Sequence, residues 1–350
     1  MLDKLREKIA EADADALLVT RPANVRYLSG FTSPADGRVL VTQDGATLLT
    51  DGRYTAQVGE ESRLETDISP ASTMWLERVS ELAAPYRLAI EADHLTVAQF
   101  QELEEKLEQV PVPTTGLVTD FRLIKTPKEL DTIRAAAKIA DDAFSHILNV
   151  IKAGLTEVEV ALELERFMRR AGADGAAFPI TVASGYRSSM PHGTASPKEI
   201  GTNELVTLDF GATVNGYHSD MTRTVAVGTV SERDRDLYDA VQAAQQAALE
   251  ALAPDKDGKA VDAVARDLLT ERGYGEYFSH SLGHGVGLEV HEAPSLTFRK
   301  SATLKPGMTA TVEPGAYLPG DAGVRVEDLA FITEDGYEQV SQSSKEFIQL

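Results

Sequence analysis

Two aspartates that flank a predicted β-hairpin are the first candidates for chemistry. Asp209 lies in an apolar, strand-like run, Asp220 follows eleven residues later, and Asn215-Gly216 between them is a strong signal for a two-residue turn. A tight turn places Asp209 opposite Thr222, with Asp220 two residues away on the same strand. Because side chains alternate between the faces of a strand, both aspartates then share one face.

The shared face would bring the two carboxylates close together. Diagonal neighbours in a hairpin lie roughly 7–8 Å apart, so the two side chains could hold adjacent cations. A β-bulge would break this register. The alternative is that Asp209 is a solvent-facing residue of an edge strand. Its neighbours Leu208 and Phe210 are apolar, and a carboxylate in such a strand is costly unless it is paired or metal-bound.

A glycine-rich segment with two histidines is the second candidate. It reads Ser281-Leu-Gly-His-Gly-Val-Gly-Leu-Glu-Val-His-Glu292, so glycines flank His284, and His291 follows seven residues later. Glycine permits close backbone approach and unusual dihedral angles. A lone histidine is more often structural, but two histidines in such a segment favour a functional role.

Two glutamates near the C-terminus also lie in apolar runs. Glu313 ends such a run just before Pro314-Gly315, and Glu327 is predicted to lie inside a strand at 324–333. Arg325 precedes Glu327 by two residues on the same face, so a buried ion pair between them is the alternative to metal binding. Each glutamate is weak evidence by itself.

Together these residues predict an oxygen-rich metal centre. The chain has no cysteine, which excludes disulfides and thiolate ligands. Four carboxylates and one imidazole favour Mn²⁺ or Co²⁺, with Zn²⁺ also compatible. Two such cations about 3.5–4 Å apart can share a hydroxide, orient a carbonyl and stabilise a tetrahedral intermediate. The predicted ligands are Asp209, Asp220, His284, Glu313 and Glu327.

Helices with clear N-terminal signals are predicted around these strands. The expected helices span about 127–152, 157–170, 232–252 and 259–272, and the strands span 178–184, 205–210, 221–227, 309–313 and 324–333. Helices packed on an antiparallel sheet make this part an α+β domain. The residue pairs with capping-box signals are Thr126/Glu129, Thr156/Glu159 and, more weakly, Ser231/Asp234.

The first third of the chain is predicted to form a separate α/β domain, residues 1–120. A strand at 16–20, a hairpin formed by 39–42 and 46–51, and a capped helix ending near 107 alternate there. Val110-Pro-Val-Pro-Thr-Thr-Gly116 is rich in proline and small residues and is the best linker candidate. Residues 121–350 form the second domain, and 350 residues suit two domains better than one.

The charge of the chain argues against several classes of partner. It has 34 basic and 55 acidic residues and a net charge of −21, which repels phosphate groups and disfavours nucleic acid and anionic membranes. The N-terminus lacks the apolar core of a signal peptide, and no apolar run approaches the roughly 18 residues that span a bilayer. We therefore expect a soluble, cytoplasmic protein.

Several motifs resemble those of one enzyme family. LDFGATVNGYHSDMTRT, SLGHGVGLEVHE, VEPG and GVRVED are similar to motifs of the pita-bread metallopeptidases. SGYRSSMPHG and RLIKTPKEL resemble the branch that contains Xaa-Pro dipeptidase (prolidase) and aminopeptidase P, and NVRYLSGF and TDGRY resemble its N-terminal domain. The resemblance covers nearly the whole chain. It implies an α/β N-terminal domain beside an α+β pita-bread (creatinase/aminopeptidase) catalytic domain.

The resemblance also implies roles for the predicted ligands. Asp220 and Glu327 would bridge two divalent metal ions per subunit, with Mn²⁺ favoured, and Asp209 would complete the first site. His284 and Glu313 would complete the second, and Glu313 would also shuttle protons for the bridging water. The substrate would be a proline-containing dipeptide or oligopeptide, and members of this branch are commonly homodimers.

Other residues are implied to act around the metals. His192 and His291 would contact the substrate carbonyl or the scissile amide and stabilise the intermediate, so that they join Glu313 as catalytic residues. Supporting residues behind the ligands keep such side chains in place. The residues implied to bind substrate are Phe178, His192, His291 and Arg299, and those implied to support the ligands are Thr222 and Arg325.

One position departs from the family pattern. Many prolidases carry an arginine four residues after the second histidine, where it binds the free carboxylate of the substrate. This chain has Ser295 there, and Arg299 is the nearest substitute. Two activities therefore stay open: cleavage of Xaa-Pro dipeptides, which we favour, and release of the first residue from longer Xaa-Pro peptides. A metal-independent creatinase-type hydrolase and a non-catalytic binding module are further alternatives, which the complete ligand set opposes.

Overall fold

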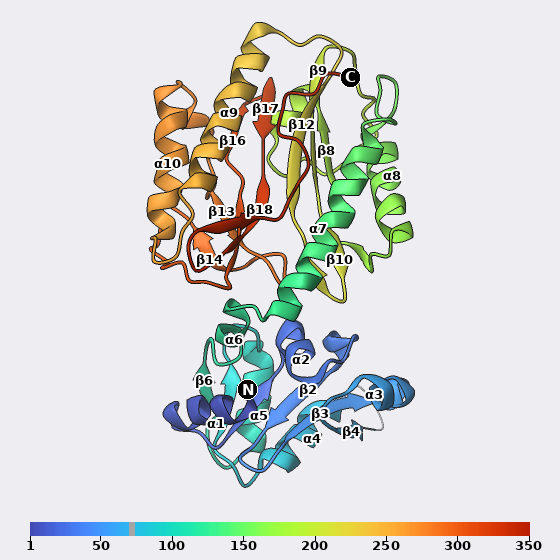
Figure 1. The fold of residues 1–350 in the computed structure, drawn as a ribbon. Helices are drawn as coiled ribbons and strands as arrows, with labels where there is room; N and C mark the ends of the chain where they lie inside the picture. The colour runs from blue at the N-terminus through green and yellow to red at the C-terminus, as the bar shows by residue number, and fades with distance from the viewer. Residues whose placement is uncertain (70–73) are drawn as a thin grey trace. The chain divides into compact units, whose positions relative to one another are not determined.

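The computed structural model describes residues 1–69 and 74–350, which form two compact units, residues 1–122 and 123–350. Each unit has hydrophobic clusters of its own, and Figure 1 labels helices and strands of both units. No helix in these described ranges is long and apolar enough to cross a membrane.

The first unit is built on a mixed six-stranded sheet in the order β4-β3-β2-β1-β5-β6. The predicted hairpin is confirmed, because Val41 pairs with Ala46 across the turn at 42–45. The strands are β1 (Ala16–Val19), β2 (Arg38–Val41), β3 (Ala46–Asp51), β4 (Glu65–Ser69), β5 (Leu88–Glu91) and β6 (Val112–Thr114). The helices are α1 (Leu2–Glu11), α2 (Pro22–Ser29), α3 (Thr55–Glu61), α4 (Trp75–Ala83), α5 (Val97–Lys106) and α6 (Thr119–Leu123).

The prediction of a linker at 110–116 was wrong. Residues Val112–Thr114 form β6, which pairs with β5 at the edge of the sheet. Proline cannot donate to a strand ladder, but an edge strand leaves one side of its backbone unpaired, so Pro113 is tolerated there. The chain passes to the second unit only after Arg122.

Three of the four long helices of the second unit begin where the capping signals predicted, and the fourth, α10, begins at Gly258 after Asp257 as its N-cap. Complete capping boxes form at Thr126 and Thr156, and the side chain of Ser231 accepts a hydrogen bond from the N–H of Asp234. The first and third of these helices end a few residues earlier than predicted. Their bounds are α7 (Pro127–Ile147), α8 (Glu157–Arg170), α9 (Glu232–Glu250) and α10 (Gly258–Glu271).

The strands of the second unit form short antiparallel sheets. Their orders are β11-β10-β7, β12-β9-β8, β13-β14, β15-β18-β19 and β16-β17. The bounds are β7 (Gly175–Ala176), β8 (Thr181–Ser184), β9 (Glu204–Phe210), β10 (Ala212–Val214), β11 (Tyr217–His218), β12 (Met221–Val227), β13 (Gly283–Gly285), β14 (Glu292–Leu296), β15 (Thr309–Val312), β16 (Gly315–Leu318), β17 (Ala322–Arg325), β18 (Asp328–Ile332) and β19 (Tyr337–Gln339).

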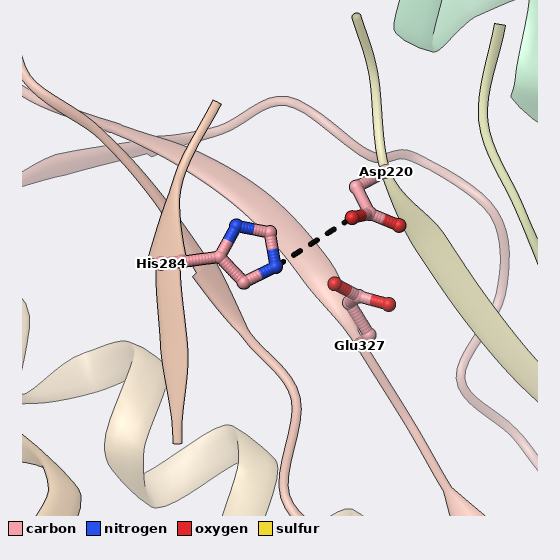
Figure 2. Close-up of side chains that lie close together, drawn as sticks. All are labelled: Asp220, His284 and Glu327. Atoms are coloured by element: carbon pink, nitrogen blue, oxygen red, sulfur yellow. Dashed lines mark ion pairs between the residues drawn. The ribbon is translucent and has the colours of Figure 1, made fainter. Parts of the chain in front are cut away.

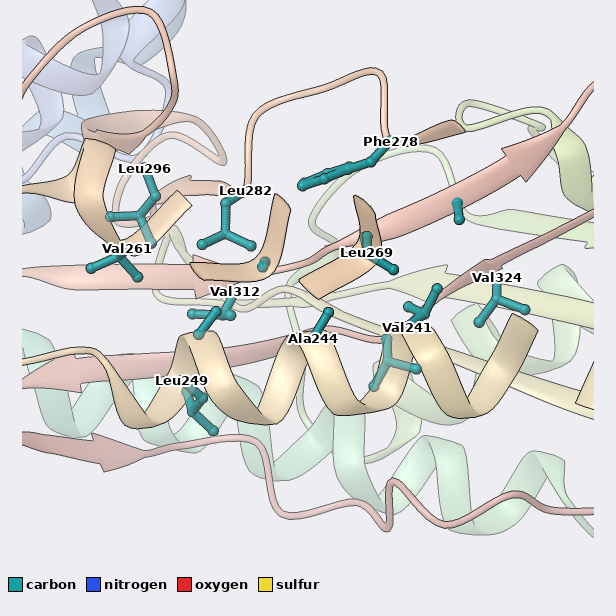
Figure 3. Packing of buried hydrophobic residues seen from close by; sticks show 14 of the residues in the cluster. Val241, Ala244, Leu249, Val261, Leu269, Phe278, Leu282, Leu296, Val312 and Val324 are labelled. Carbon is teal, nitrogen blue, oxygen red and sulfur yellow. The ribbon is translucent and has the colours of Figure 1, made fainter. Parts of the chain in front are cut away.

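Two pairs of helices cover the two halves of this strand layer. α7 and α8 share a core with β8, β9 and β12, to which Phe144 and Leu164 contribute. α9 and α10 share a second core with β15 to β18, where Val241, Leu269 and Val312 are fully buried (Figure 3). Figure 1 shows the two pairs flanking the strands on opposite sides. The α+β class is confirmed, and the candidate site lies where the two halves meet.

Candidate metal centre

The hairpin that carries the two aspartates has the predicted register. Asp209 on β9 pairs with Thr222 on β12, and the same register holds from β10 and β11 at the tip of the hairpin. Positive φ angles of 46° at Asn215 and 74° at Gly216 form the tight turn. Asp220, one residue before β12, is near enough to Asp209 for their charges to interact.

Three side chains from separate segments meet beside this hairpin. Asp220 precedes β12, His284 lies on β13 and Glu327 follows β17, and their ligand atoms lie within 4.8 Å of one another. Figure 2 shows the three side chains pointing toward one another. Asp220 Oδ2 lies 3.7 Å from His284 Nε2. Asp220 and Glu327 are only 5% and 2% exposed, so water does little to screen them.

The other two predicted ligands adjoin this group. Glu313 follows β15, where its Oε1 lies 3.2 Å from His284 Nε2 and accepts a 3.1 Å hydrogen bond from Thr311 Oγ1. Asp209 Oδ2 accepts a 2.7 Å hydrogen bond from the guanidinium of Arg325. The structure therefore brings all five predicted ligands into one neighbourhood.

The prediction that Glu327 lies inside a single strand at 324–333 was wrong. The run is divided into β17 and β18, which belong to different sheets, and Glu327 lies in the break. Its N–H donates to the carbonyl oxygen of Thr222 at 3.1 Å, and its Oε2 accepts from Thr222 Oγ1 at 2.7 Å. The break is possible because β12 satisfies this backbone N–H in place of a continued ladder.

Arg325 pairs with Asp209 rather than with Glu327, which corrects the alternative interpretation of Glu327. The buried guanidinium donates to Asp209 Oδ2 at 2.7 Å, to Thr222 Oγ1 at 3.0 Å and to the Tyr317 hydroxyl at 2.6 Å. Arg325 is thus linked to Glu327 indirectly, because the Thr222 hydroxyl accepts from Arg325 and donates to Glu327. Both residues expected to support the ligands, Thr222 and Arg325, contact a predicted ligand.

The electrostatics of the cluster favour a bound positive charge. Burial raises the pKa of Asp220, and repulsion from Glu327 and Asp209 raises it further. Burial and the charges of Glu313 and Asp209 likewise raise the pKa of Glu327. Burial opposes the charged form of His284, but the hydrogen bond and charge of Glu313 raise its pKa to about 9. Burial opposes ionisation of Glu313, yet His284 lowers its pKa to about 2.

A divalent cation fits this cluster. Oε1 of Glu327 is buried and finds no hydrogen-bond partner among residues 1–69 and 74–350. A buried carboxylate oxygen without a partner is costly, and several carboxylates in one place repel one another. A cation removes both penalties, and oxygen and imidazole donors suit Mn²⁺, Co²⁺ and Zn²⁺.

The two further histidines lie on separate loops. β13 and β14 form a hairpin, so His291, just before β14, returns to His284, and their ring centroids lie 4.3 Å apart. His192 is exposed. The carbonyl oxygen of the preceding Pro191 accepts a 3.1 Å hydrogen bond from Arg325, which ties this loop to the residue that also holds Asp209.

Phe178 and Arg299 make their contacts elsewhere. Phe178 is half-buried and lines a surface hollow with side chains of α8 such as Leu162. Arg299 is exposed in the turn after β14, with its guanidinium 5.2 Å from the ring centre of Phe298. Within the described ranges, these contacts of Phe178 and Arg299 do not include a predicted ligand.

His280 and Tyr317 form a hydrogen-bonded pair beside the ligands that was not predicted from the sequence. The Tyr317 hydroxyl, which accepts from Arg325, lies 3.0 Å from His280 Nε2. Nδ1 of His280 lies 2.8 Å from the Ser281 carbonyl oxygen and so carries the proton, which leaves Nε2 to accept from the tyrosine. Burial raises the pKa of Tyr317 to about 12. A Cβ at position 315 would collide with the Tyr317 hydroxyl. Gly315 is therefore the feature of the sequence that could have indicated a close contact here.

A buried ion pair lies behind Glu327. The side chains of Arg223 and Asp328 are 1% and 0% exposed and lie 2.7 Å apart, and Lys345 approaches Asp328 to 2.6 Å. Arg223 also donates to the carbonyl oxygens of Thr222 and Glu327. This pair therefore holds the backbone from which two residues of the site project.

Asp328→Asn is expected to lower the free energy of unfolding by about 3–5 kcal/mol, because it leaves Arg223 buried without a counter-charge. Urea unfolding followed by circular dichroism measures the loss. The matched control is Asp321→Asn, which removes an exposed pair with Arg233 and should cost less than about 1 kcal/mol. Similar small losses in both variants would contradict the expectation.

Comparisons with known proteins agree with this architecture. The model of metallopeptidase family M24 matches residues 131–334, and that of the creatinase/prolidase N-terminal domain matches residues 1–124. An Xaa-Pro dipeptidase of Pyrococcus furiosus is 38% identical, over 99% of both chains.

Solved structures give the same result. The structure of an Xaa-Pro dipeptidase from Bacillus anthracis is 43% identical with a TM-score of 0.95, covering 100% of this chain and 99% of that one. An X-Pro aminopeptidase from Thermotoga maritima is 34% identical with a TM-score of 0.92, with the same coverage. The family models and these full-length matches account for both units, and the chain belongs to metallopeptidase family M24, a membership that implies divalent metal ions.

Proposed function

We propose that this chain is a metal-dependent Xaa-Pro dipeptidase. The observation that carries the proposal is that the cluster of Asp220, His284 and Glu327 lies in a chain that matches a Pyrococcus furiosus Xaa-Pro dipeptidase from end to end. The Xaa-Pro bond lacks an N–H and populates the cis form as well as the trans form. General peptidases handle such a bond poorly, so a dedicated enzyme is chemically reasonable.

Two divalent ions per subunit are proposed, with Mn²⁺ as the expected metal and Co²⁺ and Zn²⁺ as the alternatives. Asp220 and Glu327 would contribute to both ions, Asp209 would contribute to the first, and His284 and Glu313 would contribute to the second. The unpartnered oxygen of Glu327 and the mutual repulsion of the carboxylates support this assignment. When bound, the ions polarise the carbonyl and lower the pKa of a bound water.

In this proposal, three side chains transfer protons or contact the peptide during hydrolysis. Hydrolysis adds hydroxide to the carbonyl carbon and a proton to the proline nitrogen. Glu313 takes the proton from the attacking water and delivers it to that nitrogen as the C–N bond breaks. His192 and His291 contact the carbonyl or the scissile amide and stabilise the negative charge that develops on oxygen.

The test restores Mn²⁺, Co²⁺ or Zn²⁺ to metal-stripped enzyme and compares matched Xaa-Pro and Xaa-Pro-Xaa peptides. Cleavage of the dipeptide alone supports the dipeptidase, and preference for the longer peptide makes the chain an aminopeptidase of the P type. Full activity without metal would favour a creatinase-type hydrolase. Absence of both metal binding and cleavage would favour a binding module.

Light scattering tests the proposed homodimer, and fractionation of the native host tests the proposed cytoplasmic location.

The second candidate, release of the first residue from longer peptides, is favoured by the position of Ser295. Ser295 pairs with His284 across the β13–β14 hairpin. Directly opposite residues project on the same face of an antiparallel pair, so position 295 faces the side of the ligands, where an arginine could grip a substrate carboxylate. Serine carries no charge for that task.

Ser295→Arg is therefore expected to raise kcat/KM for Xaa-Pro dipeptides by about 10–100-fold, the effect of one charge-assisted hydrogen bond. Activity on Xaa-Pro-Xaa should change little, because its carboxylate lies one residue further away. Ser295→Gln adds similar bulk without charge and should show no gain. A gain with both variants, or with neither, would contradict a carboxylate-reading role for this position.

Arg299 is the proposed substitute in the present sequence, and Arg299→Ala tests it with the same peptides. If Arg299 grips the carboxylate, the variant loses activity on the dipeptide and keeps it on the longer peptide. Equal activity of the parent and the variant on the dipeptide would show that Arg299 does not bind the substrate.

A further inference from the structure

His192 depends on its loop for its position. Its side chain is exposed, and it follows the 3₁₀ turn Gly185–Ser189 in the loop that connects β8 to the strands beyond. Because this imidazole is exposed, packing constrains it less than a buried side chain, and its position depends on the backbone of the loop. The contacts that fix this backbone therefore decide whether His192 is in place for the reaction.

One carboxylate binds both ends of this loop. Glu157 is 0% exposed and stands at the first turn of α8. Its Oε1 accepts hydrogen bonds of 2.8 Å from both the N–H and the hydroxyl of Ser184, before the loop. Its Oε2 accepts from the N–H and the hydroxyl of Ser196, after the loop, at 3.0 and 2.6 Å. It also pairs with Arg187 inside the loop at 2.9 Å.

The same network continues toward His192. Arg187 donates to the carbonyl oxygen of Thr194 at 2.6 Å, so it joins the two arms of the loop. Arg325 donates to the carbonyl oxygen of Pro191 at 3.1 Å, the residue immediately before His192. The loop is thus held at its base by Glu157 and near its tip by the arginine that also binds Asp209.

The helix itself does not need Glu157 at this position. Thr156 and Glu159 already form a complete capping box at the start of α8, and that box satisfies the first backbone N–H groups. A fully buried carboxylate is costly to desolvate. Its hydrogen bonds go to the ends and interior of the His192 loop, so the loop, not the helix, accounts for it.

We propose that Glu157 is a positioning residue for the reaction, which acts by holding the loop that presents His192 to the substrate. The inference rests on the proposed function of His192. Its hydrogen bonds and ion pair go to Ser184, Arg187 and Ser196, none of which is a predicted ligand, so the loss of Glu157 should lower turnover without changing metal content.

The main experiment measures kcat of Glu157→Gln in the parent and in the His192→Ala background. Glutamine keeps the size of the side chain, but its amide nitrogen must face one of the donors that now bond to the carboxylate. We expect a fall of about 10–100-fold in the parent, as for a catalytic group displaced by about 1 Å. In the His192→Ala background we expect less than about a two-fold change, because the loop carries no imidazole. An equal fall in both backgrounds would overturn the proposal.

A control on the same helix separates positioning from general stability. Glu163 on α8 pairs with Arg166 and His146, away from the loop, so Glu163→Gln should change kcat less than about two-fold. If Glu157→Gln does not fold, Arg187→Met removes the partner instead. Arg187→Lys, which keeps the charge, should recover part of the lost turnover, and failure of Arg187→Met to lower kcat would overturn the proposal.

Hydrogen exchange gives a readout that does not depend on peptide cleavage. Amides of residues 185–194 should exchange about ten-fold faster or more in Glu157→Gln, as for the loss of one charge-assisted hydrogen bond, while segments that carry the predicted ligands stay unchanged. Unchanged loop exchange would overturn the proposal. If the parent cleaves no Xaa-Pro peptide with any metal, the proposed function fails, and the exchange data still decide whether Glu157 holds the loop.

Discussion

Glu313→Gln is expected to fold like the parent and to lose at least about 100-fold in kcat, the contribution of a positioned proton-transfer group. Glu313 lies 3.2 Å from His284 and accepts a hydrogen bond from Thr311. Glutamine has the same size, so these neighbours still pack, but its amide cannot take up and release a proton. The measurement is kcat on an Xaa-Pro dipeptide at saturating metal, with the thermal unfolding curve as the check on folding.

The metal content of the variant distinguishes the two roles assigned to Glu313, proton shuttle and metal ligand. A variant that keeps its metal and loses turnover has lost the proton shuttle, and one that binds less metal has also lost a ligand. Glu338→Gln is the matched control, because Glu338 is a partly exposed carboxylate that pairs with Arg134; its activity should stay within about two-fold of the parent. Turnover of Glu313→Gln within a few-fold of the parent would show that the proposed mechanism is wrong.

His192→Ala is expected to lower kcat by about 10²–10³-fold, the usual effect of removing one donor to a developing oxyanion. The exposed imidazole lies on a loop outside the group formed by Asp220, His284 and Glu327. Its removal should leave the metal content unchanged. Steady-state kinetics measures kcat, and elemental analysis of the same preparation measures the metal content.

The control for this variant is His146→Ala. His146 lies on α7 and pairs with Glu163, so its loss removes an imidazole from the same unit without touching the site, and kcat should stay within about two-fold. Loss of metal from His192→Ala would instead make His192 a ligand. Unchanged turnover would show that His192 takes no part in the reaction. It would also contradict the proposal that Glu157 acts on turnover by positioning His192.

The hairpin of the two aspartates could be predicted because its signals are local. Asn215-Gly216 favours a tight turn, and a tight turn sets which residues pair for the whole hairpin. The observed pairing of Asp209 with Thr222 follows from that turn. The helix starts at Thr126 and Thr156 were equally predictable, since a capping box involves residues only three positions apart.

The break at Glu327 could not be predicted from the same kind of pattern. Residues 324–333 read as one apolar strand, yet the chain leaves one sheet and joins another there. What permits the break is the carbonyl oxygen of Thr222, which lies 105 residues earlier and accepts the N–H of Glu327. The periodicity of residues 324–333 carries no information about a hydrogen-bond partner so far away in the sequence.

The choice of partner for Arg325 has the same origin. Spacing along the chain offered Glu327, two residues away, as an alternative partner, but the guanidinium donates to Asp209 on another strand. The proline-rich segment at 110–116 was misjudged for a related reason: whether a proline can sit in a strand depends on whether that strand is at the edge of its sheet, and the order of strands is a property of the folded unit.

By itself, the sequence determined the features that depend on residues a few positions apart: the turn, the register, the helix caps and the kinds of side chain available to hold a cation. Only the tertiary structure decided which carboxylate keeps a free oxygen, which one Arg325 neutralises, and how Glu157 holds the loop of His192. The physical reason is that each of these outcomes is a competition among buried polar groups for partners. Those partners come from segments tens to more than a hundred residues apart, and they become neighbours only when the unit folds.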